Sequence, residues 1–242
     1  MVDDIPVTAT SAAPATSDEG SRRMNPELPR VTISSSMEYV EKMSWALAHA
    51  MLPNPVWRVL IKGDTDGKGE EESEEKLLPS YHAVIKDFLT AGVNAGAFIA
   101  ESGDFAAFAA WCPPGSHEAP KTSSDTPDLD KEISIDGLEQ EVDKVRDELI
   151  WSKHGQEFWW LRLLGRDPRK SAVPGAVRAV LQPSMDRAAA EGNPIWLATT
   201  SPHARDIYLH MGWQLVRTVE FGGHNEWCMI LYPPSTEEEA GR

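Results

Sequence analysis

The pattern of apolar and polar residues predicts alternating helices and strands over most of the chain. Apolar residues recur at the spacing of a helix with one buried face in the segments 36–52, 78–93, 135–151, 176–191 and 202–211. Short apolar runs bounded by turn residues predict strands at 30–34, 97–100, 105–111, 157–164, 194–200, 213–221 and 227–232. This order of elements is typical of an α/β (α+β) fold around one mixed sheet.

Capping and turn residues fix several of the expected boundaries. Ser36 is placed to cap the helix that ends before Pro53. Gly192 follows the helix 176–191, and glycine commonly ends helices because it adopts positive φ without strain. The Ser-Gly-Asp turn at 102–104 lies between two apolar runs, which predicts a β-hairpin.

Four segments lack the periodicity of regular structure. Residues 1–29 are rich in Ser, Thr, Ala and Pro, and we expect them to form a disordered arm. We expect acidic loops at 64–76 and 116–134, and an acidic tail at 235–242. The remaining segment, 30–234, has the length of a single domain that carries these loops as insertions.

The composition excludes some classes of protein. Of the 242 residues, 41% are hydrophobic and nine are Trp, which is enough apolar material for a core. Most of the Trp residues lie on predicted strands, where we expect them to be buried. The net charge of −15 argues against a nucleic-acid partner. No apolar segment has the length of a membrane span and no signal peptide is evident, so we expect a cytoplasmic protein without a membrane partner.

The chain shows few of the common motifs of reactive sites. Its two cysteines, Cys112 and Cys228, each follow a Trp in an apolar run, and we interpret them as buried free thiols. The spacing of His, Cys and carboxylate residues matches no metal site, and we expect no bound metal. The sequence also lacks a Gly-x-Ser-x-Gly nucleophile elbow and a Walker A loop.

Basic residues gather around one predicted loop, although the chain as a whole is acidic. The loop precedes the helix 176–191, and a helix N-terminus with exposed backbone N–H groups favours phosphate. A solvated loop that carries several cations is the alternative interpretation. The cluster comprises Arg162, Arg166, Arg169, Lys170 and Arg178.

Two motifs in the C-terminal third resemble those of a known family. The segment 198–213, Ala-Thr-Thr-Ser-Pro-His-Ala-Arg-Asp-Ile-Tyr-Leu-His-Met-Gly-Trp, is similar to a strand and a helix with an Ala-x-x-x-Tyr-x-x-x-Gly-Phe ending, with Trp in place of Phe. The segment 160–168 is similar to a central strand that closes on Asp-Pro. Both motifs resemble the GNAT superfamily of acyl-CoA-dependent N-acetyltransferases, especially its small fungal members. The resemblance covers 157–232 and implies a central, mostly antiparallel mixed sheet flanked by helices.

The resemblance also implies acetyl-CoA as a co-substrate, with its pyrophosphate in the loop before the helix 176–191. The family signature there is Gln/Arg-x-x-Gly-x-Gly/Ala, in which small residues let the backbone approach phosphate oxygens. Here Gly175 matches the first glycine, Ala172 stands at the Gln/Arg position and Val177 at the second glycine, and Pro174 removes one N–H donor. The implied cofactor residues are Leu164, Arg166, Arg169, Lys170, Ser171, Ala172, Gly175, Ala176 and Val177.

The resemblance assigns chemical roles to a few residues. Tyr208 matches the family's general acid, which protonates the leaving thiolate. The backbone N–H of Leu163 or Leu164 matches the group that polarises the carbonyl. Glu157, at the start of the central strand, is the candidate general base. The expected acceptor is a small-molecule or peptide amine, and the sequence leaves the oligomeric state open.

The atypical loop keeps a second hypothesis open. A protein with this fold could have lost the use of acyl-CoA and serve as a ligand-binding module, or perform other chemistry in the same cleft. If the protein is an N-acyltransferase, as the resemblance implies, the acetyl or related acyl group passes directly from acyl-CoA to the amine, because neither cysteine has the surroundings of an activated nucleophile.

Overall fold

The computed structural model of the chain describes residues 27–54, 56–58, 73–116, 135–221 and 223–234. Four predicted segments lie wholly or mostly outside the described residues: the arm, the acidic loops at 64–76 and 116–134, and the acidic tail. No helix within the described ranges is long and apolar enough to span a lipid bilayer.

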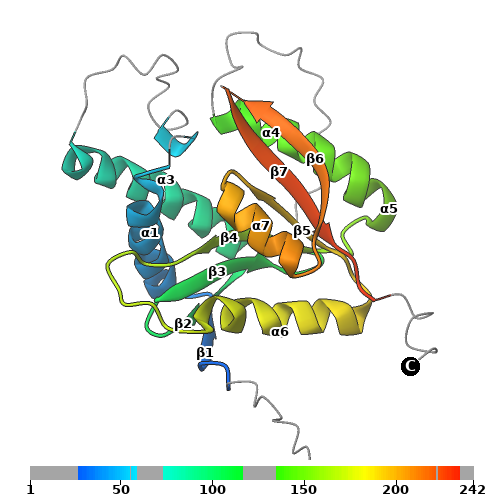
Figure 1. The fold of residues 1–242 in the computed structure, drawn as a ribbon, viewed down its shortest axis with the longest axis horizontal. Helices are drawn as coiled ribbons and strands as arrows, with labels where there is room; N and C mark the ends of the chain where they lie inside the picture. Colours follow the sequence, from blue (N-terminus) through cyan, green and yellow to red (C-terminus); the bar gives the residue numbers. More distant parts are fainter. Residues whose placement is uncertain (1–26, 55, 59–72, 117–134, 222, 235–242) are drawn as a thin grey trace, which may run out of the picture.

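Seven strands form one mixed sheet in the order β1-β2-β3-β4-β5-β7-β6, which confirms the expected fold class (Figure 1). The β4–β5 pair is parallel and the other neighbouring strands are antiparallel. The strands are β1 (Val31–Ser34), β2 (Phe98–Ser102), β3 (Ala107–Cys112), β4 (Trp159–Gly165), β5 (Ile195–Thr199), β6 (Gln214–Phe221) and β7 (His224–Leu231). The helices are α1 (Met37–Met51), α3 (Glu74–Asn94), α4 (Ile135–Arg146), the π-helical segment η2 (Asp147–Trp151), α5 (Ser152–His154), α6 (Ala176–Glu191) and α7 (Pro202–His210).

Most predicted boundaries agree with these elements to within a few residues, and two differ. Helix α3 begins at Glu74 rather than Leu78, because Lys76 N donates a hydrogen bond to the carbonyl of Ser73 (2.9 Å). The carboxylate of Glu74 also suits the positive end of the helix dipole. The helix expected over 135–151 changes to π-helical geometry at Asp147.

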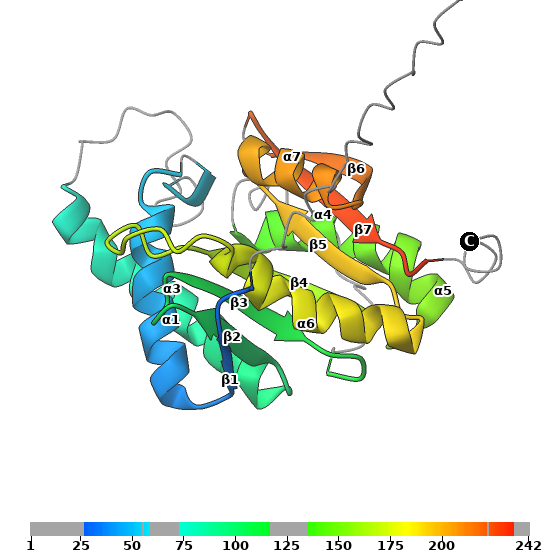
Figure 2. The same ribbon diagram turned by 60° about the horizontal axis from the view of Figure 1, so that its bottom comes forward.

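The helices cover the sheet on both faces (Figure 2). Helices α6 and α7 pack on one face, in a cluster built around Trp111, Trp159 and Leu197. Helices α1 and α3 pack on the opposite face of β2, β3 and β4, and α4 packs beside them over Trp196 and Ile230. The strand tryptophans are therefore largely core residues, as expected, because the buried strands have apolar neighbours on both faces.

Two irregularities of β4 create the space for a site. Only Trp159 and Trp160 of β4 pair with β5, through Ile195 and Trp196, so the two strands separate beyond that point. On its other edge β4 carries a β-bulge, because Leu161 faces Trp111 and Leu163 faces Ala110, which leaves Arg162 without a partner on β3. The sheet thus opens next to a strand whose backbone is locally distorted.

Candidate functional site

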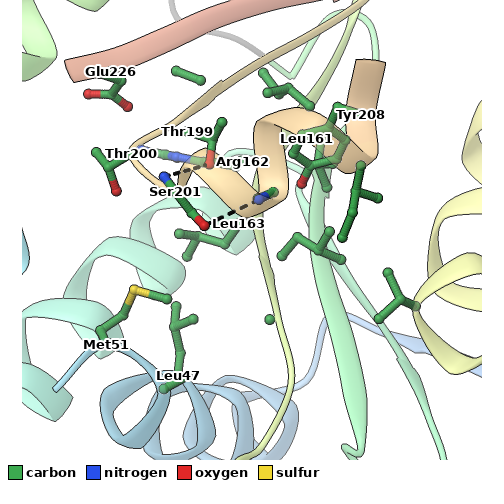
Figure 3. Close-up of a pocket in the computed structure, with 18 of the residues that line it drawn as sticks. Leu47, Met51, Leu161, Arg162, Leu163, Thr199, Thr200, Ser201, Tyr208 and Glu226 are labelled. Carbon is green, nitrogen blue, oxygen red and sulfur yellow. Dashed lines mark hydrogen bonds between the residues drawn. The ribbon is translucent and has the colours of Figure 1, made fainter. Parts of the chain in front are cut away.

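A cavity of about 1160 Å3 occupies the opening between β4 and β5 and is lined from both faces of the sheet (Figure 3). Figure 3 shows Tyr208 beside Leu161 on one side, and Leu47 and Met51 of α1 across the cavity from them. The lining residues on the α6/α7 face are Val177, Arg178, Gln182, Met185, Ala204 and Tyr208, and those on the other face include Leu47, Ile85, Phe88, Leu138, Val142 and Asp143.

The residues of β4 divide between the two faces. Leu161 packs in the same cluster as Tyr208, whereas Leu163 packs against the cluster of α1 and α3. Arg162 lies on the α3 side, where its guanidinium carbon is 3.7 Å from the ring centroid of Phe88. Both faces of the sheet therefore meet the cavity at one short stretch of strand, and two molecules bound on opposite faces could react in the gap.

Helix α7 places Tyr208 in the lining of this gap. Ser201 caps α7, since its Oγ accepts a hydrogen bond from Ala204 N (3.2 Å), and Pro202 occupies the first turn. Trp213 N donates to the Tyr208 carbonyl (3.0 Å), and the two rings lie 5.5 Å apart. Tyr208 is 4% exposed, and burial raises the pKa of its hydroxyl above the usual range. The hydroxyl is therefore protonated at neutral pH and available as a hydrogen-bond donor.

The loop between β4 and α6 is held by ion pairs within the protein. Asp167 is 3% exposed and accepts hydrogen bonds from Arg169 N (3.0 Å), Nε (2.8 Å) and Nη2 (2.7 Å). These bonds keep the pKa of the Asp167 carboxyl below its usual range. Lys170 Nζ binds the carbonyl and the carboxylate of Asp104, in the β2–β3 turn. Two cations of the predicted basic cluster therefore already have carboxylate partners.

The N-terminus of α6 provides another group of donors. Gly175, at φ 79°, precedes the helix and gives it no side-chain cap. The helical bonds start with Ala179 N donating to the Gly175 carbonyl (2.8 Å), and Ala176 N donates to Val173 (3.1 Å). Between these two bonds lie the N–H groups of Val177 and Arg178, which belong to the first turn and have no carbonyl acceptor within the helix. Both residues line the cavity, so an anion there would meet these donors.

The predicted site residues divide into two groups by position. Leu164, Arg166 and Val177 line the cavity together with Tyr208. The other predicted cofactor residues lie in the loop or helix start but are not among those that line it: Arg169, Lys170, Ser171, Ala172, Gly175 and Ala176.

The structure does not bring Glu157 to the cavity. Glu157 is exposed and precedes Trp159, whose pair with Ile195 lies at the closed end of the β4–β5 opening. Glu157 is therefore not among the residues that line the cavity, and its role as a general base stays a prediction. The reason is that the strands separate at their C-terminal ends, so the start of β4 is remote from the opening.

Several cavity residues were not singled out from the sequence. Phe88 of α3, Asp143 of α4 and Glu226 of β7 all line the cavity. Asp143 pairs with Arg146 (2.6 Å), and burial is the largest effect on its carboxyl and raises its pKa. No local motif marks these residues, because each comes from a different element and only the fold brings them together.

The cysteines and the acidic residues form no further reactive centre in the described part of the chain. Cys112 and Cys228 are buried free thiols, as predicted, and burial raises the pKa of both, to about 12 for Cys228. Neither lines the cavity. The described residues contain no cluster of His, Cys, Asp and Glu that could hold a metal ion.

The seven-stranded mixed sheet, with helices on both faces, matches the GNAT fold of solved acetyltransferase structures. A solved structure from Corynebacterium glutamicum, described as histone acetyltransferase HPA2 and related acetyltransferase, is 14% identical at a TM-score of 0.52 and covers 87% of this chain and 98% of its own. The polyamine N-acetyltransferase of Drosophila melanogaster, which forms N-acetylagmatine, is 16% identical at a TM-score of 0.52, with coverage of 84% and 100%. An agmatine N-acetyltransferase is 19% identical at a TM-score of 0.51, with coverage of 84% and 99%.

Sequence comparisons add little to the structural ones. No family model matches the chain. A Saccharomyces cerevisiae protein, increased recombination centers protein 11, is 28% identical over 68 residues, which are 28% of this chain and 44% of that protein. The chain therefore matches less than half the length of this curated relative.

Proposed function

We propose that the protein transfers an acetyl or related acyl group from acyl-CoA to an amine by direct attack. The observation that carries this proposal is the cavity that crosses the sheet between β4 and β5, with Tyr208 at the crossing. A thioester bound on the α6/α7 face would reach the gap from one side. An amine bound over α1, α3 and α4 would reach it from the other.

The residues present fit a CoA molecule on the α6/α7 face. The uncapped first turn of α6 offers the N–H groups of Val177 and Arg178 to the pyrophosphate, and the helix dipole adds to the attraction. Arg166 and Arg178 also line the cavity and carry positive charge. CoA supplies the activated thioester, and the protein binds it, orients it and provides hydrogen bonds.

The protein's own groups fit the needs of acyl transfer. The amine forms a bond to the carbonyl carbon while the carbon–sulfur bond breaks, and the proton lost by the amine passes to solvent. Backbone N–H groups of β4 that have no β5 partner beyond Trp160 are placed to donate to the carbonyl oxygen. The Tyr208 hydroxyl, which lines the cavity, gives its proton to the leaving sulfur and regains one from solvent.

A binding module without transferase activity is the second candidate. The ion pairs of Arg169 with Asp167 and of Lys170 with Asp104 favour it, because these cations are occupied within the protein. On this hypothesis the cavity would bind a ligand without acyl-CoA.

Calorimetry of the full chain with acetyl-CoA and with desulfo-CoA separates the two candidates. The transferase hypothesis predicts saturable binding of both ligands and weaker binding after Arg178→Ala. Arg187→Ala is the matched control, since Arg187 lies on the same helix, pairs with Glu191 and does not line the cavity. An absence of binding at about millimolar ligand would exclude the transferase hypothesis. Mass spectrometry of amine mixtures incubated with protein and acetyl-CoA then tests for a gain of acetyl mass.

A further inference from the structure

The guanidinium of Arg162 contacts two aromatic rings on the acceptor side of the cavity. Its central carbon is 3.7 Å from the ring centroid of Phe88 and 5.0 Å from that of Trp160. A Cβ added to Gly92 would lie 3.1 Å from Nη1, so the group also abuts the end of α3. Rings on the faces of a guanidinium do not occupy its N–H groups, because all five donors lie in the guanidinium plane.

Arg162 is a cation without a carboxylate partner among the described residues. Asp143, which also lines the cavity, gives its carboxylate to Arg146 at 2.6 Å. Nε of Arg162 is buried without a hydrogen-bond partner, and another part of the guanidinium faces the thiol of Cys112. A charge at the wall of a largely apolar cavity is costly unless an anion accompanies it.

We propose that the acceptor amine carries a carboxylate, and that Arg162 binds this carboxylate at the edge of its guanidinium. A carboxylate accepts two parallel hydrogen bonds from such an edge, which fixes both its distance and its orientation. This proposal rests on the proposed transferase function and adds the chemical class of the acceptor.

The position of Arg162 suits an α-amino acid or a similar compact acceptor. Arg162 is the bulged residue of β4, directly beside Leu161 and Leu163, which border the opening where transfer would occur. A carboxylate at Arg162 would therefore leave an amine on the adjacent carbon close to the opening. The surrounding wall is apolar, with Ile85 and Val142 among its residues, and favours an apolar side chain on the acceptor.

The wild-type full chain provides the first test. We expect kcat/KM with acetyl-CoA to be about 10–100-fold higher for phenylalanine than for phenethylamine, and for leucine than for 3-methylbutylamine, because only the amino acids supply the charged hydrogen-bond acceptor. Equal values for each pair would overturn the proposal.

Variants at Arg162 provide the second test. Arg162→Gln should abolish the preference for the carboxylate without weakening acetyl-CoA binding, and Arg162→Lys should keep part of it. Arg187→Gln is the matched control, because Arg187 also stacks on a tryptophan, with its central carbon 5.3 Å from the Trp159 ring, but lies outside the cavity. A preference that survives Arg162→Gln would overturn the proposal. Thermal melting of each variant shows whether it is folded. If Arg162→Gln is not folded, the comparison of amino acids with amines on the wild-type chain still tests the proposal.

Two further arms separate this proposal from its alternatives. Succinyl-CoA could be preferred over acetyl-CoA, with Arg162→Gln removing that preference and no acceptor distinguished by its carboxylate. In that case the carboxylate belongs to the acyl donor, and the acceptor assignment is overturned.

If no acyl-CoA binds, the transferase proposal fails instead. Calorimetry with N-acetylphenylalanine and N-acetylphenethylamine then tests the carboxylate site alone: binding of only the former, lost in Arg162→Gln, supports the site, and equal binding overturns it.

Discussion

Gly165 ends β4 at a point where the structure leaves no room for a side chain. A Cβ at this position would lie 2.6 Å from Cε2 and 2.8 Å from Cζ of Phe108, and 3.1 Å from Cδ1 of Leu47. Both neighbours are completely buried, so neither ring nor methyl group can turn into solvent. Carbon atoms prefer separations of about 3.5–4.0 Å, and Gly165→Ala therefore requires the Phe108 ring or the end of β4 to move by roughly 1 Å.

The size of this effect follows from overpacking. Inserting a methyl group into a packed core costs about 1–3 kcal/mol, and replacing glycine stabilises by about 0.4–1 kcal/mol through the unfolded state. The difference leaves a net loss of at most about 2.6 kcal/mol. For a chain of this size, each kcal/mol changes the melting temperature by about 2–4 °C, so Gly165→Ala should lower it by up to about 10 °C.

Differential scanning calorimetry of a double-mutant cycle tests the cause as well as the size. Phe108→Leu alone should also destabilise, because it removes buried ring atoms. Combined with Gly165→Ala it should cost at least about 0.5 kcal/mol less than the sum of the two single variants, since the smaller side chain makes room for the new methyl group. Strict additivity, or a melting temperature that rises in Gly165→Ala, would refute the proposed clash.

The remaining predictions concern the proposed transfer and the loop beside it. Tyr208→Phe should lower kcat by about 10²–10⁴-fold with little change in the Kd of acetyl-CoA, measured by steady-state kinetics and calorimetry, and an unchanged kcat would remove the residue from the acid role. The depressed pKa of Asp167 stabilises the fold above the carboxyl's unfolded pKa of about 3.9, and this stabilisation is lost as the pH falls through the folded value. Asp167→Asn should therefore lower the melting temperature at pH 7, and the difference from wild type should shrink below about pH 4; a pH-independent difference would contradict the role of the Arg169 pair. Asp104→Asn should change stability by less than about 1 kcal/mol, because the pair is solvent-exposed, yet release Lys170 and tighten CoA binding at low salt; unchanged or weaker binding would show that Lys170 does not reach the anion.

The order of elements could be predicted from the sequence because it depends on local signals. Ser36 caps α1 as expected, with its Oγ accepting from Tyr39 N at 3.4 Å. Gly192 ends α6 at φ 73°, a conformation that glycine adopts without strain. Helical spacing of apolar residues also placed α6 and α7 correctly, since each buries one face against the sheet.

The site was less predictable because its geometry depends on contacts between distant segments. Lys170 meets Asp104, 66 positions earlier, and this pair removes a cation that the sequence assigned to phosphate. The register shift that isolates Arg162 is a property of the pairing between β3 and β4, and neither strand carries a glycine or proline at the bulge that could have indicated it. Glu157 was expected to begin the central strand, but it lies two residues before β4, at the end where β4 pairs with β5, since the sequence does not show which end of a strand separates from its neighbour.

The character of the cavity lining also bears on how a transfer would proceed. A covalent acyl-enzyme needs an activated nucleophile, and the buried Cys112 and Cys228 lie outside the lining. Two lining hydroxyls are engaged as backbone caps, since Thr199 Oγ1 accepts from Ser201 N (3.3 Å) and Ser201 Oγ accepts from Ala204 N (3.2 Å). The opening between β4 and β5, by contrast, lets donor and acceptor approach from opposite faces of the sheet at the same time. If the protein is the proposed transferase, this geometry favours direct attack of the amine on the thioester within a ternary complex over transfer through the protein.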